Sequence, residues 1–268
     1  GGLSKVSSWA DRSGSYNSLS QSSSVYQPAY EVENGKPHLL FDGVDDFLSR
    51  SLPSSLVGNP SFTVLMAVES VSDGRVVQIG SNSGAANQVI GLSSSGSFEY
   101  NQGSLSSFSN FTGLTVGAFR RAEGATRGQG EFYRFGSKQT MLVINGSGTI
   151  SIPGASSMMS LGNGVTVSGG NSFFGGKIHE VMYFSSELND FAVRRLEGYL
   201  AWKWGTQANL VNGHPFKANR PSFGGSQSIT LGSENIQLDS SDNLPFVSIF
   251  DGPFVLDGSF ATSGLNVI

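Results

Sequence analysis

Apolar and polar positions change their period within residues 176–205. Over residues 177–184, apolar side chains alternate imperfectly with polar ones between a glycine pair and a serine pair, which predicts a β-strand. Beyond it, apolar side chains recur at the spacing of one helical face. That stripe consists of Val193, Leu196, Leu200 and Trp204. With Asn189 as a candidate N-cap and Gly205 as a candidate C′ residue, the pattern predicts one strand followed by one helix.

The other apolar segments are short, and turn-forming Gly, Asn, Ser or Pro residues separate them. Residues 61–69 form a nearly continuous apolar run, which predicts a central strand buried on both faces. The FDGVDDFL segment predicts a strand ending in Asp-Gly, a turn, and a new strand from Phe47, and Asn145-Gly146 is the clearest hairpin turn. Further strands are expected at 75–79, 89–92, 97–100, 114–119, 131–135, 139–144, 148–152 and 158–161. This spacing is typical of an antiparallel sandwich or jelly roll.

Composition favours the same fold class. Of 268 residues, 38% are hydrophobic and only 13% charged, with 36 Gly and 19 Phe, which suits short strands and many turns better than helices. We therefore predict an all-β, two-sheet antiparallel sandwich with one helix late in the chain. Residues 1–221 would form this sandwich. Residues 222–268, which alternate at Ile229/Leu231 and Ile236/Leu238, would form a β-rich extension or assembly arm.

Charge and cysteine content exclude several classes of function. A net charge of −4 gives no field that would attract nucleic acid, and no apolar run is long enough to insert into a membrane. The basic cluster of Arg120, Arg121, Arg127 and Arg134 surrounds a glycine-rich segment that we interpret as a solvated loop. The absence of cysteine excludes disulfides, thiol catalysis and cysteine-based zinc sites.

Three motifs in order carry a resemblance to a known family. They are WADRSG at 9–14, FDGVDDFL at 41–48, and the strand–helix segment that ends in EGYLAWKWG at 197–205 and is followed by HPFK at 214–217. Together they resemble the laminin-G-like, concanavalin A-like lectin/glucanase modules of bacterial secreted proteins and phage structural proteins. The resemblance implies a concanavalin A-like jelly roll with the helix packed on it. Because such modules usually have one more strand before the first motif, we expect an N-terminal strand to be missing.

Catalytic residues of that family have no counterpart in this sequence. Glycosidases of this fold are similar to one another in carrying Glu-x-Asp-x-x-Glu on one strand. Here Glu180 and Glu69 are each the only carboxylate of their strand, and Glu31 and Glu33 lie on a short edge segment where we expect them to face solvent. No Gly-x-Ser-x-Gly turn accompanies the three histidines. The sequence therefore predicts a protein that is not an enzyme.

One turn could bind a metal ion. Asp42, Asp45 and Asp46 could offer oxygen ligands to Ca²⁺, and calcium sites occur at the rim of relatives of this fold. The alternative, which we favour, is that Asp42 and Asp45 bond the backbone of the turn, because three carboxylates fall short of the usual ligand count. We predict no cofactor, with calcium as the alternative, and three dispersed histidines do not favour zinc.

Sugar binding would need exposed aromatic rings beside amide or carboxylate groups. The principal candidates are Tyr100, Asn101, Asn171 and Phe173. Their neighbours Gln102, Phe108, Asn110, Phe111 and Phe174 are further candidates. Each of these aromatic residues is more often part of a core, and Trp202 and Trp204 are interpreted as helix-packing residues.

These observations predict a non-catalytic recognition or structural module located outside the cell or on a virion surface. It would be part of a phage virion, as a fibre, spike or decoration protein, or of a secreted adhesin. It would bind a glycan or other protein subunits through loops at one rim, as a homo-oligomer or within a larger assembly. Two alternatives remain open: a divergent polysaccharide hydrolase whose carboxylates come from separate strands, and a purely architectural subunit.

Overall fold

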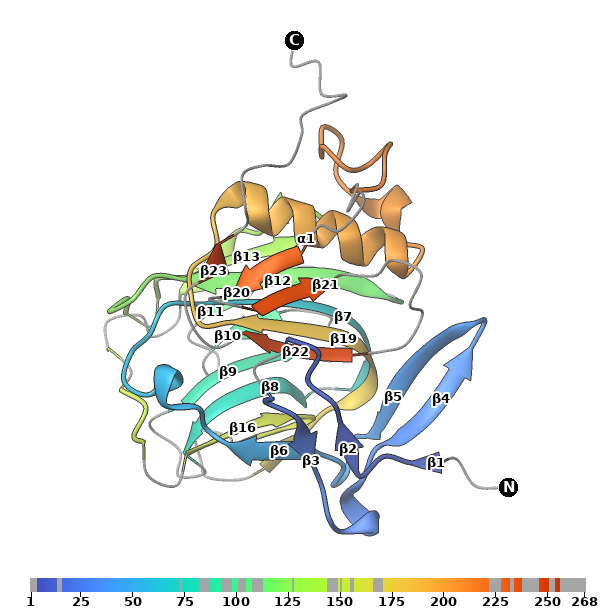
Figure 1. Cartoon of the computed structure of the whole chain (residues 1–268), viewed down its shortest axis with the longest axis vertical. Coiled ribbons are helices and arrows are strands. Elements are labelled where there is room, and N and C mark those ends of the chain that lie inside the picture. The colour runs from blue at the N-terminus through green and yellow to red at the C-terminus, as the bar shows by residue number, and fades with distance from the viewer. Residues whose placement is uncertain are drawn as a thin grey trace.

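Two large β-sheets and a single α-helix dominate the computed structural model of this chain (Figure 1). The structure describes residues 4–13, 16–72, 74–81, 87–92, 98–100, 105–107, 113–126, 128–143, 149, 151–154, 157–165, 171–221, 228–231, 234–237, 246–250 and 254–255. Within these ranges the helices are α1 (Asp190–Lys203) and the short 3₁₀ turns η1 (Ser24–Tyr26), η2 (Ser54–Leu56) and η3 (Gln207–Asn209). No described helix has both the length and the apolarity required to cross a membrane.

The first sheet contains the strand that precedes the helix. In spatial order it comprises β1 (Ser4–Lys5), β4 (Ala29–Glu33), β5 (Lys36–Asp42), β19 (Gly175–Phe184), β7 (Phe62–Ser72), β12 (Thr115–Arg121), β13 (Glu131–Arg134) and β14 (Ser137–Lys138). These strands pair antiparallel. A further strand, β22 (Phe246–Phe250), pairs with β19 in parallel.

The second sheet faces the first. Its order is β15 (Met141–Val143), β11 (Leu105–Ser107), β10 (Phe98–Tyr100), β9 (Asn87–Leu92), β8 (Gly74–Ser81), β16 (Ser157–Leu161), β6 (Leu48–Ser51), β3 (Leu19–Ser20) and β2 (Ser8–Trp9). Two small sheets complete the described strands: β17 (Asn163–Val165) with β18 (Asn171–Phe173), and β21 (Glu234–Gln237) with β20 (Ser228–Leu231) and β23 (Phe254–Val255). The predicted two-sheet antiparallel sandwich with one helix is confirmed.

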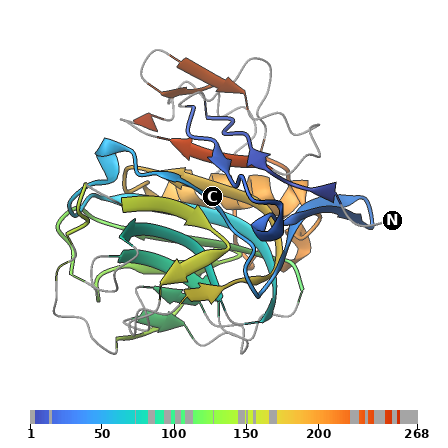
Figure 2. The same cartoon turned by 90° about the horizontal axis from the view of Figure 1, so that it is seen from below.

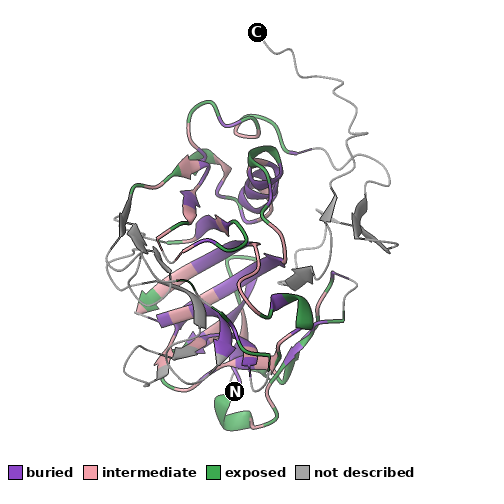
Figure 3. Cartoon of the chain, turned by 90° about the vertical axis from the view of Figure 1, so that its left-hand side faces the viewer, coloured by how far each residue is buried: buried purple, intermediate pink, exposed green. Residues whose placement is uncertain are grey.

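Strand β7 contributes side chains to two cores, so the molecule has three layers: the second sheet, the first sheet and α1. Successive side chains of a strand point to opposite faces. Phe62, Val64, Met66 and Val68 therefore lie in the core between the two sheets, whereas Leu65 and Ala67 lie in a second core under α1. Both faces are buried (Figure 3), which is why this segment reads as a continuous apolar run. The helix covers the face of the first sheet opposite the second sheet (Figures 1 and 2).

A β-bulge interrupts the alternation of β19. Its register with β7 shifts between Ile178 and Glu180, so His179 is the extra residue. As a result Ile178 and Val181, three positions apart, both face the core between the sheets. The His179 ring packs between His38 and Trp204, at centroid distances of 5.1 and 4.9 Å. This bulge is the physical cause of the imperfect pattern seen in the sequence.

The helix begins and ends where the sequence predicts. The Asn189 side chain accepts a hydrogen bond of 2.9 Å from the Ala192 amide, and Gly205 follows the helix with φ of 71°. The apolar stripe of α1, which ends in Trp204, is buried against the first sheet. Trp202 donates a hydrogen bond to the Phe216 carbonyl, so both tryptophans pack the helix as predicted.

Local details differ from the sequence-based expectations at two places, and a third expectation is not tested. Residues 148–152 were expected to form a strand, but Thr149 and Ile152 form isolated bridges with Thr126 and Gly58. The strand after the Asp-Gly turn begins at Leu48 and lies in the opposite sheet, because the turn crosses between layers. The Asn145-Gly146 hairpin lies outside the described residues.

Candidate functional site

An open hollow of about 900 Å³ lies at the rim of the first sheet, where β12 ends and a glycine-rich loop leads to β13. Register places Arg120 of β12 opposite Glu131 of β13. The side chains around this hollow are mostly charged or amide-bearing. They include Arg120, Glu123, Gln129, Glu131, Lys138 and Glu187. The loop is thus one wall of a hollow, a placement that its composition alone does not indicate.

Arg120 holds the wall of the hollow together. Its Nε and Nη2 atoms donate to Glu131 Oε2 at 2.8 and 2.6 Å, and Nη2 also donates to the Tyr133 hydroxyl at 3.0 Å. Nη1 donates to the Leu188 carbonyl at 2.9 Å, and Nη2 lies 2.5 Å from Asp190 Oδ1. One guanidinium therefore connects two strands to the start of α1, which gives the hollow a defined shape.

Glu131 remains ionised in this network. Partial burial opposes ionisation, but hydrogen bonds from Lys138, Arg120 and Tyr133 outweigh it and lower the pKa of Glu131 to about 2. Burial and the hydrogen bond to Glu131 raise the pKa of Tyr133. A carboxyl group with this pKa accepts hydrogen bonds but does not deliver a proton near neutral pH.

A second hollow of about 610 Å³ adjoins the first and has an aromatic ring at its edge. Arg120 and Glu187 line both hollows, and Phe191 lines the second. The Phe191 side chain lies in the first turn of α1 and is 53% exposed, whereas the helix stripe is buried. Phe191 was not among the sequence-based candidates. The sequence did contain a signal for its exposure, because Phe191 does not fall on the apolar stripe of the helix.

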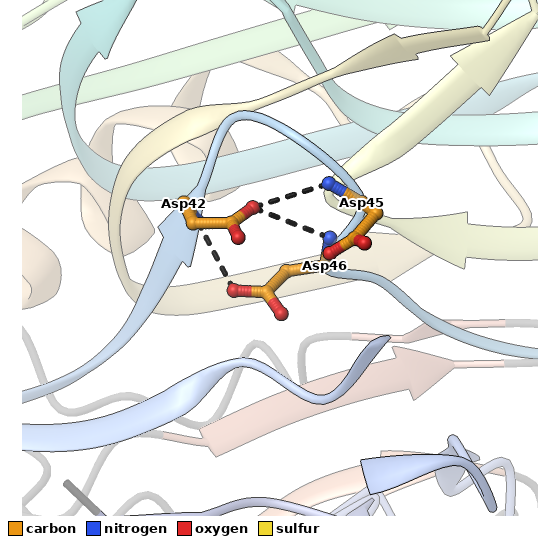
Figure 4. A group of neighbouring side chains, drawn as sticks. All are labelled: Asp42, Asp45 and Asp46. Atoms are coloured by element: carbon orange, nitrogen blue, oxygen red, sulfur yellow. Dashed lines mark hydrogen bonds between the residues drawn. The ribbon is translucent and has the colours of Figure 1, made fainter. Parts of the chain in front are cut away.

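The three aspartates of the Asp42–Asp46 turn do converge (Figure 4), with one ligand atom of each within 4.8 Å of the others. Asp42 Oδ1 accepts hydrogen bonds from the amides of Val44 and Asp45 at 2.8 and 3.2 Å, and Asp46 Oδ2 accepts one from the Asp42 amide at 3.1 Å. Lys5 lies 3.5 Å from Asp46 Oδ1. The carboxylates that bond the turn backbone are therefore Asp42, as expected, and Asp46 in place of Asp45, which contributes its amide. Calcium binding stays the alternative.

Environment separates the pKa values of two of these aspartates. For Asp42, burial opposes ionisation, but the backbone amides that it accepts lower its pKa overall. For Asp46, burial and the nearby Asp42 charge raise the pKa. The two carboxyl groups differ because Asp42 accepts three backbone amides, whereas Asp46 is more buried and lies beside the Asp42 charge.

The described residues among the predicted sugar-binding candidates lie on two different strands. Tyr100 ends β10 in the second sheet, whereas Asn171 and Phe173 belong to β18 of a separate two-stranded sheet. Asn101 lies outside the described residues, as do Gln102, Phe108, Asn110 and Phe111. Phe174 is fully buried beside Phe41, with 6.2 Å between ring centroids, so it is a core residue.

The carboxylates of the central strands are occupied by structural contacts. Glu180 is fully buried, 2.9 Å from Lys203 Nζ and 3.0 Å from Trp204 Nε1. Glu33 and Glu69 both contact the Lys177 ammonium beside a small pocket of about 220 Å³. The contact with Lys177 lowers the pKa of Glu33. Glu180 is thus enclosed, whereas Glu33 and Glu69 line that small pocket with their carboxylates on Lys177.

Comparison with known proteins gives only distant structural likenesses. No family model matches the chain, and no curated protein matches it. A heptameric SAP-like pentraxin from Limulus polyphemus is similar at 13% identity and a TM-score of 0.40, over 62% of this chain and 84% of that one. The carbohydrate-binding CBM40 of the Ruminococcus gnavus IT-sialidase, bound to α2,3-sialyllactose, is similar at 11% identity and 0.42, over 58% and 94%.

The botulinum neurotoxin serotype C1 binding domain is also similar, at 11% identity and a TM-score of 0.43, over 74% of this chain and 52% of that one. These TM-scores are too low to carry an argument about function.

Proposed function

We propose that this chain is a non-catalytic recognition module of an extracellular or virion surface, part of a phage virion or of a secreted adhesin, and that it binds a saccharide in the two adjoining rim hollows. The observation that carries the proposal is the exposed ring of Phe191 beside hydrogen-bonding groups that line both hollows. A sugar ring has an apolar face and several hydroxyl groups. It therefore suits a site in which an aromatic side chain can stack on that face and polar groups can bond the hydroxyls.

The charges around the hollows favour a neutral, hydroxyl-rich ligand. The cations Arg120 and Lys138 are already paired with Glu131. The exposed carboxylates of Glu123 and Glu187 have no partner among the described residues, so their oxygens are available to accept hydrogen bonds from sugar hydroxyls. A ligand carboxylate would be repelled by these two acids. In the described part of the wall, Arg120 and Lys138 already pair with Glu131 and so compensate this repulsion little.

Recognition without catalysis is favoured by the state of the acids. Hydrolysis of a glycosidic bond needs one carboxyl group that is protonated when the substrate binds. Glu131, which the hollow holds in place, has its pKa lowered to about 2. Glu180, the acid of the strand that precedes the helix, is fully buried under α1. Glu131 therefore serves as a hydrogen-bond acceptor in the hollow and not as an acid catalyst.

A saccharide panel tests this proposal on the full chain. We expect neutral saccharides to bind, and Phe191→Ala or Glu187→Gln to weaken binding by about tenfold, equivalent to about 1.4 kcal/mol. Val71→Ala is the matched control, because Val71 is exposed near the opposite end of the β7–β12 pairing from Arg121. Binding that both hollow variants retain, or a preference for acidic saccharides, would contradict the proposal. Repeating the panel with and without Ca²⁺ tests the aspartate turn.

A divergent glycoside hydrolase is the alternative function, favoured by the shared contact of Glu33 and Glu69 with Lys177. Two carboxyl groups brought together from separate strands are what such an enzyme would need. Polysaccharide hydrolysis that is abolished by Glu69→Gln, and unchanged by Glu187→Gln, would establish this alternative in place of simple recognition.

A further inference from the structure

The pairing of β22 with β19 is unlike every other pairing of the described strands. It is parallel, with Glu180 opposite Phe246 and Phe184 opposite Phe250, whereas the remaining described pairs are antiparallel. The strand also arrives late, after the helix and after the turn-rich segment that ends at Pro221. β22 is thus an addition to a sandwich whose own strands are already connected antiparallel.

The bulge at His179 creates the edge that β22 occupies. Before the bulge, β5 pairs with β19 as far as Ile178, opposite Leu39. After the bulge, β22 pairs with β19 from Glu180 to Phe184, off the main strand order of the sheet (Figure 1). The side chains from Glu180 to Phe184 are fully buried. Without a second strand, this edge would leave backbone groups of a core strand unpaired, which is costly.

The tail, residues 222–268, has one described strand pairing with the sandwich. Among the described residues, β20, β21 and β23 pair only with one another, so β22 provides the only strand pairing between the tail and the sandwich. Pro221 is buried, and its ring lies within contact distance of the Gly198 position in α1. The sandwich is therefore anchored up to Pro221, and the chain beyond it carries the docking strand.

We propose that the edge of β19 from Glu180 to Phe184 is a strand-acceptor site, and that β22 of a second copy of this chain enters it, so that two copies exchange their tails reciprocally. An exchanged pair makes the same β19–β22 contacts as a single chain. Exchange therefore sacrifices no pairing, and it is opposed mainly by the entropy of association. The site and its occupant are both parts of this chain, so the inference is independent of any saccharide.

Engineered cysteines test the exchange in the full chain, which contains no cysteine of its own. Met182 and Ser248 are register partners across β19 and β22. Met182→Cys and Ser248→Cys, prepared separately, are unfolded, mixed and refolded together under oxidising conditions. We expect a disulfide-linked species of twice the 28.2 kDa chain mass, in a share that rises with protein concentration. The double variant in one chain shows that the register permits the bond.

The controls make each outcome decisive. Met182→Cys mixed with Gln237→Cys, whose strand β21 pairs with β20, should give little covalent dimer. Equal cross-linking in that mixture, or an internal disulfide in the double variant without any covalent dimer from the separate variants, would overturn the proposal. Light scattering of the cysteine-free chain is independent of the cysteine variants. Val247→Pro, which interrupts the strand, should convert a concentration-dependent dimer to monomer, and a chain that is monomeric at all concentrations would also overturn it.

Discussion

Glu131 at the rim and Glu180 under the helix are two carboxylates with similar partners and opposite behaviour. Each is bound by a lysine and by a hydrogen-bond donor on an aromatic ring, Tyr133 for one and Trp204 for the other. Yet the pKa of Glu131 is lowered to about 2, and burial raises the pKa of Glu180 despite the Lys203 ammonium. The number of partners alone does not decide the ionisation of an acid.

The difference is hydration. The Glu131 side chain is 31% exposed and is also bound by Arg120, so water and two cations stabilise its charge. The side chains of Glu180 and Lys203 are both completely buried, and the cost of removing charge from water dominates there. The rim acid is therefore a permanent acceptor that can face a ligand, whereas the buried acid ties β19 to α1.

The largest effect is expected from breaking the buried pair. Glu180→Ala would leave the Lys203 ammonium without its carboxylate in a dry site, so we expect the free energy of unfolding to fall by about 3–5 kcal/mol. Urea denaturation of the purified chain measures this change. Glu187→Ala, an exposed carboxylate, is the control and should change it by less than about 0.5 kcal/mol. Equal free energies of unfolding for the two variants would show that the Glu180–Lys203 pair does not stabilise the fold.

A second buried acid, Glu197, makes the free energy of unfolding depend on pH. Glu197 accepts a hydrogen bond of 3.0 Å from the Gly136 amide, and burial raises its pKa from 4.5 to about 7. The folded state therefore binds the proton more tightly than the unfolded state, so this group makes stability fall as pH rises from about 4.5 to 7. The expected loss is about 3 kcal/mol, since one pKa unit corresponds to about 1.4 kcal/mol.

The measurement is the free energy of unfolding between pH 4.5 and 8 for the natural chain and for Glu197→Gln. The variant has no proton to lose, so its profile should lack this downward component. His214, whose pKa burial lowers to about 4, contributes in the opposite direction between 6.5 and 4 and is present in both proteins. Parallel profiles for the two proteins would contradict the assignment.

The smallest expected effect concerns the rim. Because the pKa of Glu131 is lower in the folded chain than in the unfolded chain, its contribution is present above pH 4.5 and is lost as pH falls towards 2. Glu131→Gln should reduce the free energy of unfolding by about 1–2 kcal/mol at pH 7, a value discounted for solvent screening. The difference from the natural chain should vanish by about pH 2, and a difference that persists at that pH would argue against an electrostatic origin.

Much of the fold could be predicted because it is encoded locally. The apolar run of β7, the Asn189 cap and the helix stripe each depend on neighbours a few residues away. The glycine-rich segment was correctly placed in a loop, but the rim hollow could not be predicted, because its lining comes from segments far apart in the chain. Arg120 meets Glu131 through strand register, and it meets Asp190 through the packing of α1, which is seventy residues distant.

The sequence by itself determined the all-β class, the strand that runs into the single helix, and the turn around Asp42, because periodicity and turn chemistry act over short distances. Only the tertiary structure decided three other matters: that Glu180 is buried, that Phe191 stands beside two hollows, and that β22 joins β19 in parallel. These depend on which distant segments meet, and on whether water reaches them. The bulge at His179 links the two levels. Its irregular pattern is visible in the sequence, but its consequence, a strand edge beyond β5 that β22 occupies, exists only after the sheets assemble.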